Sequence, residues 1–469
     1  MASSKNDGRS LDVTVTLVDI SGNEITKGTW MGHCKIHELF QAAHKSKPGF
    51  LCKLLHGSEE LSPQRDFASL CENLDHITVV WICGPGQNML HEHRAFAALK
   101  SDGSVITWGQ AADGGDSSLV EHRLQEGVVQ VVGSGNAFAA VKSDRSVIAW
   151  GQAAHGGDSS LVKHRLQEDV EQVVGSGRAF AAVKSDGSVI TWGLAACGGD
   201  SSGVEHRLQK GVVQVAGNGY AFAAVMSDGS VITWGQAADG GDSSPVKHRL
   251  QEGVVQVVGN GHAFAAVKSD GSVIAWGHAA CGGDSSGVEH RLEEGVVQVV
   301  GTTMAFAAVK SDGSVVTWGH AADGGDSSLV KRRLEEGAVQ VVGTTMAFAA
   351  IMSGGSVITW GHAANGGDSS GVEHRLQKGV VQVVGNGYAF AAVMSDGSVI
   401  TWGKSRAGGD SSLVKHRLQK GVVRVVGNGY AFAAVKSDGS VITWGQAADG
   451  GDSSLVEHRL QDGVVDVVS

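Results

Sequence analysis

An aspartate, two serines and a histidine recur together through most of the chain, with first copies at Asp116, Ser117, Ser118 and His122. These residue types could form the Ser-His-Asp triad of a hydrolase. A catalytic site is rarely copied nine times, however, and Asp and Ser also cap the N-termini of helices. The recurrence therefore predicts structural capping, no catalytic residue and a chain that is not an enzyme.

Three other motifs could bind ligands, and each has a simpler structural explanation. Gly-Gly-Asp near Asp113 or Asp102 suggests calcium, but the nine-residue period of calcium β-rolls is absent and Asp113 is not kept in every unit. His91-Glu92-His93 offers only two histidines, which is little for a metal site. Gly217-Asn218-Gly219-Tyr220 lacks the third glycine of a dinucleotide-binding fingerprint. We expect no metal and no cofactor.

Composition narrows the class of protein. The chain has 469 residues and a net charge of -11, which disfavours general nucleic-acid binding because phosphates are neutralised by clustered Lys and Arg. None of the six cysteines lies in a Cys-x-x-Cys pair, so we expect free thiols. The first ten residues are polar and no run approaches the ~18 apolar residues of a membrane span. We therefore expect a cytoplasmic protein without membrane association, with the nucleus as the alternative location.

The elements that must position any site begin with a repeated hairpin, first seen over Ala95–Gly109. Two apolar runs flank Asp102-Gly103, a dipeptide typical of a type I′ turn. The pattern returns every 42 residues, which indicates a propeller, a solenoid or another repeat array. Its tryptophans are Trp108, Trp150, Trp192, Trp234, Trp276, Trp318, Trp360, Trp402 and Trp444.

Each unit contains two more elements. Ser118 and Glu121 match a capping box before Leu124, which predicts a helix of about two turns. The β-branched run Val128–Val132 predicts a third strand. The hairpin strands are apolar on both faces, so neighbouring units must cover them. We expect nine such units over residues 93–469, following a linker over 84–92.

The two ends of the repeat region complement each other. The first hairpin has no Val-Val-x-Val-Val strand before it, whereas Val464–Val468 is such a strand with no hairpin after it. Pairing this last strand with the strand at Ala95 would complete every unit and leave no open sheet edge. The chain therefore predicts a closed ring of nine three-stranded blades, with an open solenoid as the alternative.

One position varies while the surrounding repeat stays uniform. It directly precedes each Ala-Phe-Ala-Ala strand, in a loop, so its nine copies would line one face of a ring. Aromatic residues, Met and Arg are enriched at protein interfaces, which makes this ring a candidate protein-binding site. The alternative is drift at tolerant loop tips. The residues are Arg94, Asn136, Arg178, Tyr220, His262, Met304, Met346, Tyr388 and Tyr430.

Residues 1–9 are expected to be a disordered leader, and residues 10–83 a small separate domain. Alternating apolar residues predict strands at 11–17 and 24–30, helical spacing predicts a helix over 35–44, and apolar runs predict strands at 50–55 and 77–82. This order, with Leu54-Leu55-His56-Gly57, resembles the ubiquitin-like β-grasp family. The resemblance implies a docking module whose binding patch includes Leu54 and Val80. The chain continues beyond residue 83, so conjugation through this domain is excluded.

The repeat Asp-Gly-Ser-Val-Ile-Thr-Trp-Gly, preceded by a Gly-x-Gly turn, resembles the regulator of chromosome condensation family. The resemblance implies a β-propeller, although nine repeats exceed the usual four to eight blades. The family's Gly-Gln-Leu-Gly segment is replaced here by Gly-Gly-Asp-Ser-Ser and the predicted helix.

Together these features predict a mainly β chain that acts as a non-enzymatic interaction scaffold, with a ubiquitin-like docking domain joined to a partner-binding propeller. We expect protein partners, either ubiquitin receptors or a small GTPase. One alternative is guanine-nucleotide exchange or association with chromatin, although no 42-residue step has room for the inserted wedge that exchange uses. Another is an accessory part of a ubiquitin ligase.

Overall fold

The computed structural model separates the chain into two compact units, Met1–Gly86 and Gln87–Ser469. The division falls inside the predicted linker over 84–92. The structure describes residues 12–18, 24–31, 39, 51–56, 59–60, 76–82, 93–335 and 337–469. The predicted leader over 1–9 lies outside these residues, as does the predicted helix over 35–44 apart from Leu39, which is buried.

The first unit contains one mixed sheet. Its strands are β1 Asp12–Val18, β2 Glu24–Met31, β3 Leu51–His56, β4 Glu59–Glu60 and β5 His76–Ile82. The strand order is β2-β1-β5-β3-β4, in which β1 and β5 run parallel and the other pairs antiparallel. All four predicted strands are present. Val15, Leu17, Leu54, Ile77 and Val79 are fully buried.

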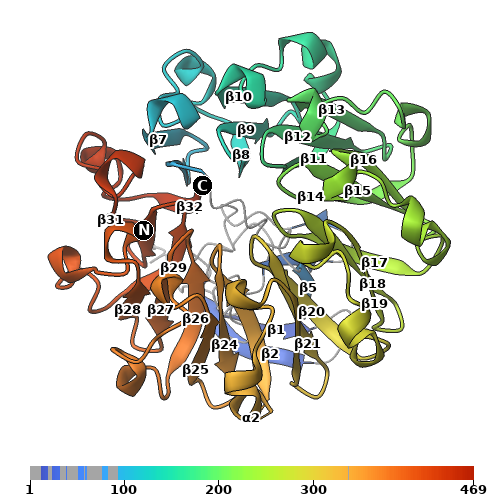
Figure 1. The fold of residues 1–469 in the computed structure, drawn as a ribbon. Helices are drawn as coiled ribbons and strands as arrows, with labels where there is room; N and C mark the ends of the chain where they lie inside the picture. Colours follow the sequence, from blue (N-terminus) through green and yellow to red (C-terminus); the bar gives the residue numbers. More distant parts are fainter. Residues whose placement is uncertain are drawn as a thin grey trace, which may run out of the picture. The chain divides into compact units, whose positions relative to one another are not determined.

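The second unit consists of nine antiparallel three-stranded sheets arranged as a ring (Figure 1). The strands near the centre are β8 Val128–Gly133, β11 Val170–Gly175, β14 Val212–Gly217, β17 Val254–Gly259, β20 Val296–Gly301, β23 Ala338–Gly343, β26 Val380–Gly385, β29 Val422–Gly427 and β32 Val464–Val468. The middle strands are β6 Ala95–Lys100, β9 Ala137–Lys142, β12 Ala179–Lys184, β15 Ala221–Met226, β18 Ala263–Lys268, β21 Ala305–Lys310, β24 Ala347–Met352, β27 Ala389–Met394 and β30 Ala431–Lys436. The outer strands are β7 Val105–Gly109, β10 Val147–Gly151, β13 Val189–Gly193, β16 Val231–Gly235, β19 Val273–Gly277, β22 Val315–Gly319, β25 Val357–Gly361, β28 Val399–Gly403 and β31 Val441–Gly445. We number the blades from blade 1 (β32-β6-β7) and blade 2 (β8-β9-β10) to blade 9 (β29-β30-β31).

The core lies between blades. Each of nine apolar clusters joins the Ala-rich strand of one blade to the Phe and Trp of the next. In every blade the two rings stack with centroids 5.2–5.4 Å apart. Ala residues let neighbouring sheets approach closely, and the aromatic pair fills the wider gap. The apolar faces predicted from the sequence are therefore covered by adjacent blades.

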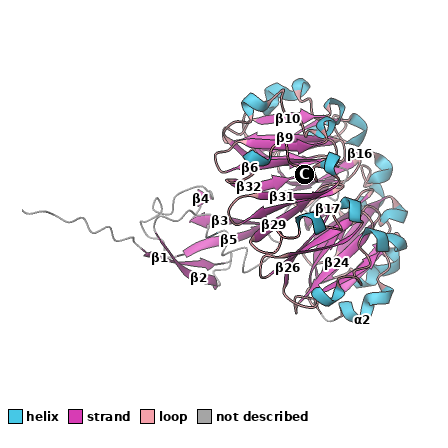
Figure 2. Ribbon diagram, turned by 90° about the vertical axis from the view of Figure 1, so that its left-hand side faces the viewer, coloured by secondary structure: helices cyan, strands magenta, loops and turns pink. Residues whose placement is uncertain are grey.

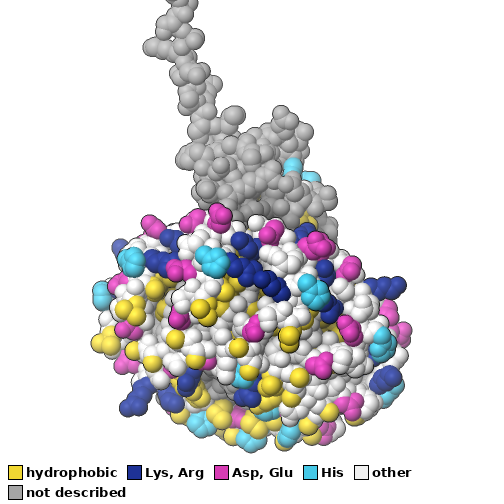
Figure 3. Space-filling model, turned by 90° about the horizontal axis from the view of Figure 1, so that it is seen from above, with side chains coloured by type: hydrophobic (Ala, Val, Ile, Leu, Met, Phe, Trp, Pro, Cys, Tyr) yellow, Lys and Arg dark blue, Asp and Glu magenta, His cyan; other side chains and the backbone are white. Residues whose placement is uncertain are grey.

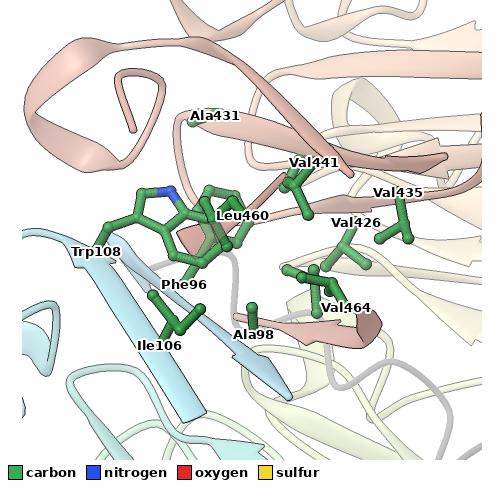
Figure 4. Packing of buried hydrophobic residues seen from close by; sticks show 12 residues of the cluster. Phe96, Ala98, Ile106, Trp108, Val426, Ala431, Val435, Val441, Leu460 and Val464 are labelled. Carbon is green, nitrogen blue, oxygen red and sulfur yellow. The ribbon is translucent and has the colours of Figure 1, made fainter. Parts of the chain in front are cut away.

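The ring closes as predicted. β32 pairs antiparallel with β6, with Val467 opposite Ala98 and Val468 opposite Ala97. Figure 4 shows the cluster at this seam, where Phe96 and Trp108 from blade 1 meet Leu460 and side chains from blade 9. The strand that the first hairpin lacks is thus supplied by the other end of the repeat region.

A histidine lies at the same seam. The His93 carbonyl accepts a hydrogen bond from Gly429 N at 2.6 Å. Its ring is 1 % exposed and meets the edge of Phe138 at a centroid distance of 4.3 Å. Burial lowers the pKa of His93 to about 4. The ring is therefore neutral at physiological pH, and the seam buries no charge at this residue.

The predicted capping box is wrong, because no side chain caps these segments, and the predicted two-turn helix forms in only some of the loops, as over Ser160–Leu166. Each loop instead has short helical turns at the ends and outer edges of the sheets (Figure 2), and most of these turns are 3₁₀. The first of each pair is η2 Ala111–Asp113, η4 Ala153–His155, η6 Ala195–Cys197, η8 Ala237–Asp239, η10 Ala279–Cys281, η12 Ala321–Asp323, η14 Ala363–Asn365, η16 Ser405–Ala407 or η18 Ala447–Asp449. The second is η3 Glu121–Arg123, η5 Ser160–Leu166, η7 Glu205–Arg207, η9 Ser244–Arg249, η11 Ser286–Arg291, η13 Ser328–Val330 with α2 Lys331–Leu334, η15 Glu373–Arg375, η17 Ser412–Val414 or η19 Glu457–Arg459.

The recurrent aspartate makes the same local bond in all nine loops. Asp116 Oδ1 accepts the Ser118 backbone N–H at 2.9 Å, which is a local turn two residues long. The bond occurs also where the helical segment is longest, as from Ser160 N to Asp158 Oδ1 at 2.8 Å before Ser160–Leu166. The bond from Ser118 N lowers the pKa of Asp116. The Asp and Ser residues of the apparent triad therefore shape a loop.

The hairpin turn also differs from the prediction. Gly103 N donates to Lys100 O and Lys100 N donates to Ser104 O, with Gly103 at φ 79. Among the described non-glycine residues only Arg145 and Asp169 have positive φ, so Asp102 does not. This is a type I turn followed by a left-handed glycine, and not the predicted type I′ turn. The requirement for positive φ at the glycine position is confirmed.

Two glycines are replaced near blade 2, one in its hairpin turn and one in the loop directly before β11 of blade 3. Arg145 has φ 64, and Asp169, which occupies the position of Gly127, has φ 62. In blade 3 a Cβ on Gly187 would lie 2.6 Å from Gly211 N, so the two positions face each other. Positive φ strains a side chain with a Cβ. These two positions therefore contain strain that glycine would remove.

We expect the double variant Arg145→Gly, Asp169→Gly to raise the free energy of unfolding by about 1 kcal/mol, after allowing for the entropy that glycine adds to the unfolded chain. The exposed Arg145–Glu171 ion pair at 3.3 Å contributes little to oppose this gain. Urea unfolding measures the change, and the reverse pair Gly187→Arg, Gly211→Asp should destabilise. A lower midpoint for the glycine variant would contradict the assignment of strain.

Candidate functional site

The variable residues lie together on one face of the ring. Three loop positions per blade contribute to it, and we call their residues the variable face. The first position, before each middle strand, is the predicted series from Arg94 to Tyr430. The second follows each outer strand: Gln110, Gln152, Leu194, Gln236, His278, His320, His362, Lys404 and Gln446. The third ends each first helical turn: Asp113, His155, Cys197, Asp239, Cys281, Asp323, Asn365, Ala407 and Asp449.

Uniform backbone contacts place these variable side chains. In every blade the backbone N–H of the second position donates to the carbonyl of the first at 2.8–3.0 Å, as from Lys404 to Tyr388. The two side chains therefore lie next to each other. Each Trp Nε1 donates to a glycine carbonyl of the preceding blade at 2.9–3.1 Å, as from Trp150 to Gly114. This bond fixes the loop that carries the second and third positions.

Buried polar side chains join the two loops of a blade from beneath. Asn218 Nδ2 donates to Asp239 O at 2.6 Å, while Asn218 Oδ1 accepts the N–H groups of Tyr220 and Ala221. Thr302 makes the corresponding bond to Asp323 O at 3.1 Å. These interactions involve the backbone at the variable positions and not the variable side chains. The scaffold can therefore stay constant while the face changes.

Carboxylates at the third position are buried and point to the next blade. Asp113 Oδ1 accepts from Asn136 Nδ2 at 3.0 Å, and Asp239 Oδ1 lies 2.9 Å from His262 Nδ1. Asp323 instead pairs within its own blade, 3.0 Å from His320 Nδ1. The carboxylates of Asp113, Asp239 and Asp323 thus lie below the surface, and each is paired with a neighbouring polar group.

Asp449 differs from these three carboxylates because its charged partner, Arg94, lies farther away. Its side chain is 2 % exposed, Oδ1 lies 3.8 Å from Arg94 Nε, and Oδ2 has no hydrogen-bond partner. Burial raises the pKa of this carboxyl, and nearby Asp113 adds to the increase. A side-chain hydrogen bond with Tyr430 raises the pKa of Arg94. Arg94 therefore holds a positive charge above a poorly satisfied carboxylate at the seam.

Aromatic rings of adjacent blades stack across the face. The Tyr220 and His262 rings lie 5.2 Å apart, and the Tyr388 and Tyr430 rings 5.1 Å apart. Lys404 Nζ lies 4.4 Å from the centroid of the Tyr388 ring. These contacts show that the predicted residues are not isolated loop tips, because their neighbours across the blade boundary touch them.

Two cysteines contribute to the third position. Cys197 and Cys281 are buried free thiols, and burial raises the pKa of both. Cys281 Sγ lies 3.4 Å from His278 Nδ1. No group of three or more His, Cys, Asp or Glu side chains in the described part of the chain is arranged to hold a metal ion. Thiols with raised pKa carry little thiolate, so these two positions are poorly suited to nucleophilic chemistry.

The structure brings together all nine predicted residues from Arg94 to Tyr430, each partly exposed. It does not support Leu54 as a docking residue. Leu54 pairs with Val79 in the sheet and is fully buried, because its side of the strand faces the core of the first unit. Val80 lies in β5 opposite Lys53, and its side chain is outside the described residues.

Sequence reasoning missed the second position altogether and treated the variation at the third only as an argument against calcium. Both could have been found by the signal that revealed the first, since each varies within a uniform repeat. It also missed the replacement of Ala-Ala by Ser405-Arg406 in blade 8. The three positions are separated by 16 and 3 residues in sequence, and these spacings do not indicate that they lie on the same face.

Comparison with known proteins finds only distant likenesses among solved structures. No protein-family model and no curated protein matches this chain. The solved structures of similar fold include Prp20 of Saccharomyces cerevisiae, with 14% identity and a TM-score of 0.36 over 57% of this chain and 80% of that one. The ectodomain of the Arabidopsis thaliana receptor kinase ACR4 has 16% identity and a TM-score of 0.34 over 57% and 93%. Human WBSCR16 has 15% identity and a TM-score of 0.35 over 80% and 94%. None of the described helices is long and apolar enough to cross a membrane.

Proposed function

We propose that the chain is a non-enzymatic interaction scaffold whose variable face binds protein partners. The observation that carries this proposal is the contrast between the scaffold and the face. Contacts of the backbone and of uniform Trp residues recur in all nine blades, whereas three adjacent positions vary. Repeat proteins present binding surfaces in this way, on a stack of similar units whose exposed residues differ. The face is rich in Tyr, His, Met and Arg, which suit protein contacts.

We propose in addition that the first unit is a ubiquitin-like docking module. The mixed strand order β2-β1-β5-β3-β4, with parallel β1 and β5, supports this proposal. Its contact surface excludes Leu54, which is buried. Proteins of the ubiquitin system would then bind the first unit, and other proteins would bind the variable face.

Affinity capture with the full chain tests both parts. Replacing Tyr220, Tyr388 and Tyr430 with serine should leave the fold intact, because these side chains are partly exposed, and should reduce partner recovery several-fold. The matched control replaces three large exposed residues of the outer loops, Leu119, Leu161 and Leu329, with serine.

Circular dichroism verifies folding of each variant, and a chain lacking residues 1–86 separates partners of the first unit. Equal recovery by the tyrosine variant and the unaltered chain would show that variation on the face is drift. If the chain lacking residues 1–86 still captures every partner, the docking proposal is wrong.

A further inference from the structure

One repeat departs from the sequence that the other eight share. After the outer strand, eight blades carry Ala-Ala at the start of the first helical turn, whereas blade 8 carries Lys404-Ser405-Arg406 before Ala407. The backbone is unchanged, since η16 ends at Gly408 with φ 93 and Lys404 N donates to Tyr388 O at 3.0 Å as in every blade. The fold therefore does not require these two cations.

Lys404 and Arg94 lie at the two ends of a stacked pair of tyrosine rings, so the contacts cross three blades. Lys404 Nζ lies 4.4 Å from the Tyr388 centroid, the Tyr388 and Tyr430 rings are 5.1 Å apart, and Arg94 Cζ lies 5.2 Å from the Tyr430 centroid. The two tyrosine hydroxyls are 3.4 Å apart. We call Arg94, Tyr388, Lys404 and Tyr430, together with the exposed Arg406 two residues after Lys404, the cationic ladder.

The accessible charge of this ladder is positive. Lys404 and Arg406 are exposed, and in the part of the chain that the structure describes neither forms an ion pair with a carboxylate. Arg94 is half-exposed, and its carboxylate partner Asp449 is buried beneath it. By contrast, Figure 3 shows a side of the molecule on which acidic and basic side chains alternate. A local excess of positive charge in a chain of net charge -11 calls for a function.

We propose that the cationic ladder binds a short acidic segment of a protein partner, an inference that rests on the protein-binding role of the variable face. Lys404 and Arg406 would pair with carboxylates, and the tyrosine rings hold Lys404 and Arg94 in place through cation–π contacts. The ladder spans blades 8, 9 and 1, whereas Arg178 in blade 3 is the other Lys or Arg among the variable positions. An extended polyanion such as nucleic acid needs cations along its whole length, so a short acidic peptide fits better.

Fluorescence anisotropy with a labelled hexaglutamate peptide, at low ionic strength, tests this proposal on the full chain. The test variant Lys404→Gln, Ser405→Ala, Arg406→Ala restores the Gln-Ala-Ala found at 446–448, so it should fold. We expect its affinity for the peptide to fall at least tenfold, and salt to weaken binding by the unaltered chain. Lys378→Gln, which removes an exposed lysine outside the variable face, should bind as the unaltered chain does.

A reciprocal graft gives a second measurement. Gln236→Lys, Ala237→Ser, Ala238→Arg places the same residues beside the stacked pair Tyr220 and His262, and it should restore binding to the test variant. No binding of hexaglutamate by the unaltered chain, equal loss in the test variant and Lys378→Gln, or tighter binding of an oligothymidylate would each overturn the proposal. If capture of partners still depends on the tyrosines in those cases, only the acidic-segment inference fails. Peptide binding without tyrosine-dependent capture would instead contradict the wider role of the face.

Discussion

Removing residues 463–469 should open the ring at a point more than 360 residues away in sequence. β32 supplies the backbone partner of β6, and Val464 and Val467 are buried in the seam cluster with Phe96 and Trp108. Burial of a valine side chain contributes roughly 1.5–3 kcal/mol, so the seam loses several kcal/mol as well as its strand pairing. We expect fast hydrogen exchange in the first hairpin, Ala95–Gly109, and unfolding at lower urea concentration.

Hydrogen exchange of the truncated chain, compared with the full chain, checks this result. Exchange in blade 5, on the other side of the ring, provides the internal control and should change least. If exchange rises only around blade 9 while Ala95–Lys100 stays protected, the pairing of β32 with β6 does not hold the ring closed. A loss of protection limited to the residues just before 463 would contradict closure in the same way.

Replacing Phe264 with alanine should destabilise the propeller by about 3–5 kcal/mol, the usual cost of removing a buried aromatic side chain. Phe264 is fully buried and stacks on Trp276 at 5.4 Å, and its ring packs against Gly240 of the preceding blade. The substitution therefore leaves a cavity between two blades and loosens the loop that carries Asp239.

Urea unfolding followed by tryptophan fluorescence measures this loss, since Trp276 reports on the same interface. Phe264→Leu keeps most of the buried volume and should cost clearly less. A change below 1 kcal/mol for the alanine variant would show that the blade interfaces contribute little to stability, contrary to the nine clusters described here.

The period, the strands and the closure of the ring were predictable because each depends on a pattern that repeats or complements itself. Trp108 and its eight copies fix the blade, and the unmatched strand at Val464–Val468 has one partner that completes it. A regular pattern of apolar residues reflects burial, and burial decides where the strands lie.

Other features depend on competition between local interactions, which the sequence pattern does not rank. Ser118 and Glu121 fit a capping box, but the Ser118 N–H is bonded to Asp116 Oδ1 and the short 3₁₀ turn begins only at Glu121. Asp102-Gly103 fits two hairpin turns, and the type I turn with a left-handed glycine is the one formed.

Only part of the variable face was predicted from the sequence. The series from Arg94 to Tyr430 was visible as variation at one position, and the backbone bond from the second position, which recurs in every blade, places it on one face. The contacts of Lys404 with Tyr388 and of Arg94 with Tyr430 join residues of different loops, so no spacing in the sequence indicates them. Leu54 was misplaced because a binding patch was carried over from the ubiquitin-like resemblance, whereas in this sheet its side chain is fully buried.

Site-specific photo-cross-linking tests the central claim, that the variable face is where partners bind. A benzophenone amino acid is placed at Met346, on the face, and at Val255, an exposed residue at the opposite end of a central strand. Irradiation in the intact cell should give discrete adducts with other proteins from Met346 and none from Val255. Adducts from Val255 alone, or the same adducts from both positions, would contradict the account.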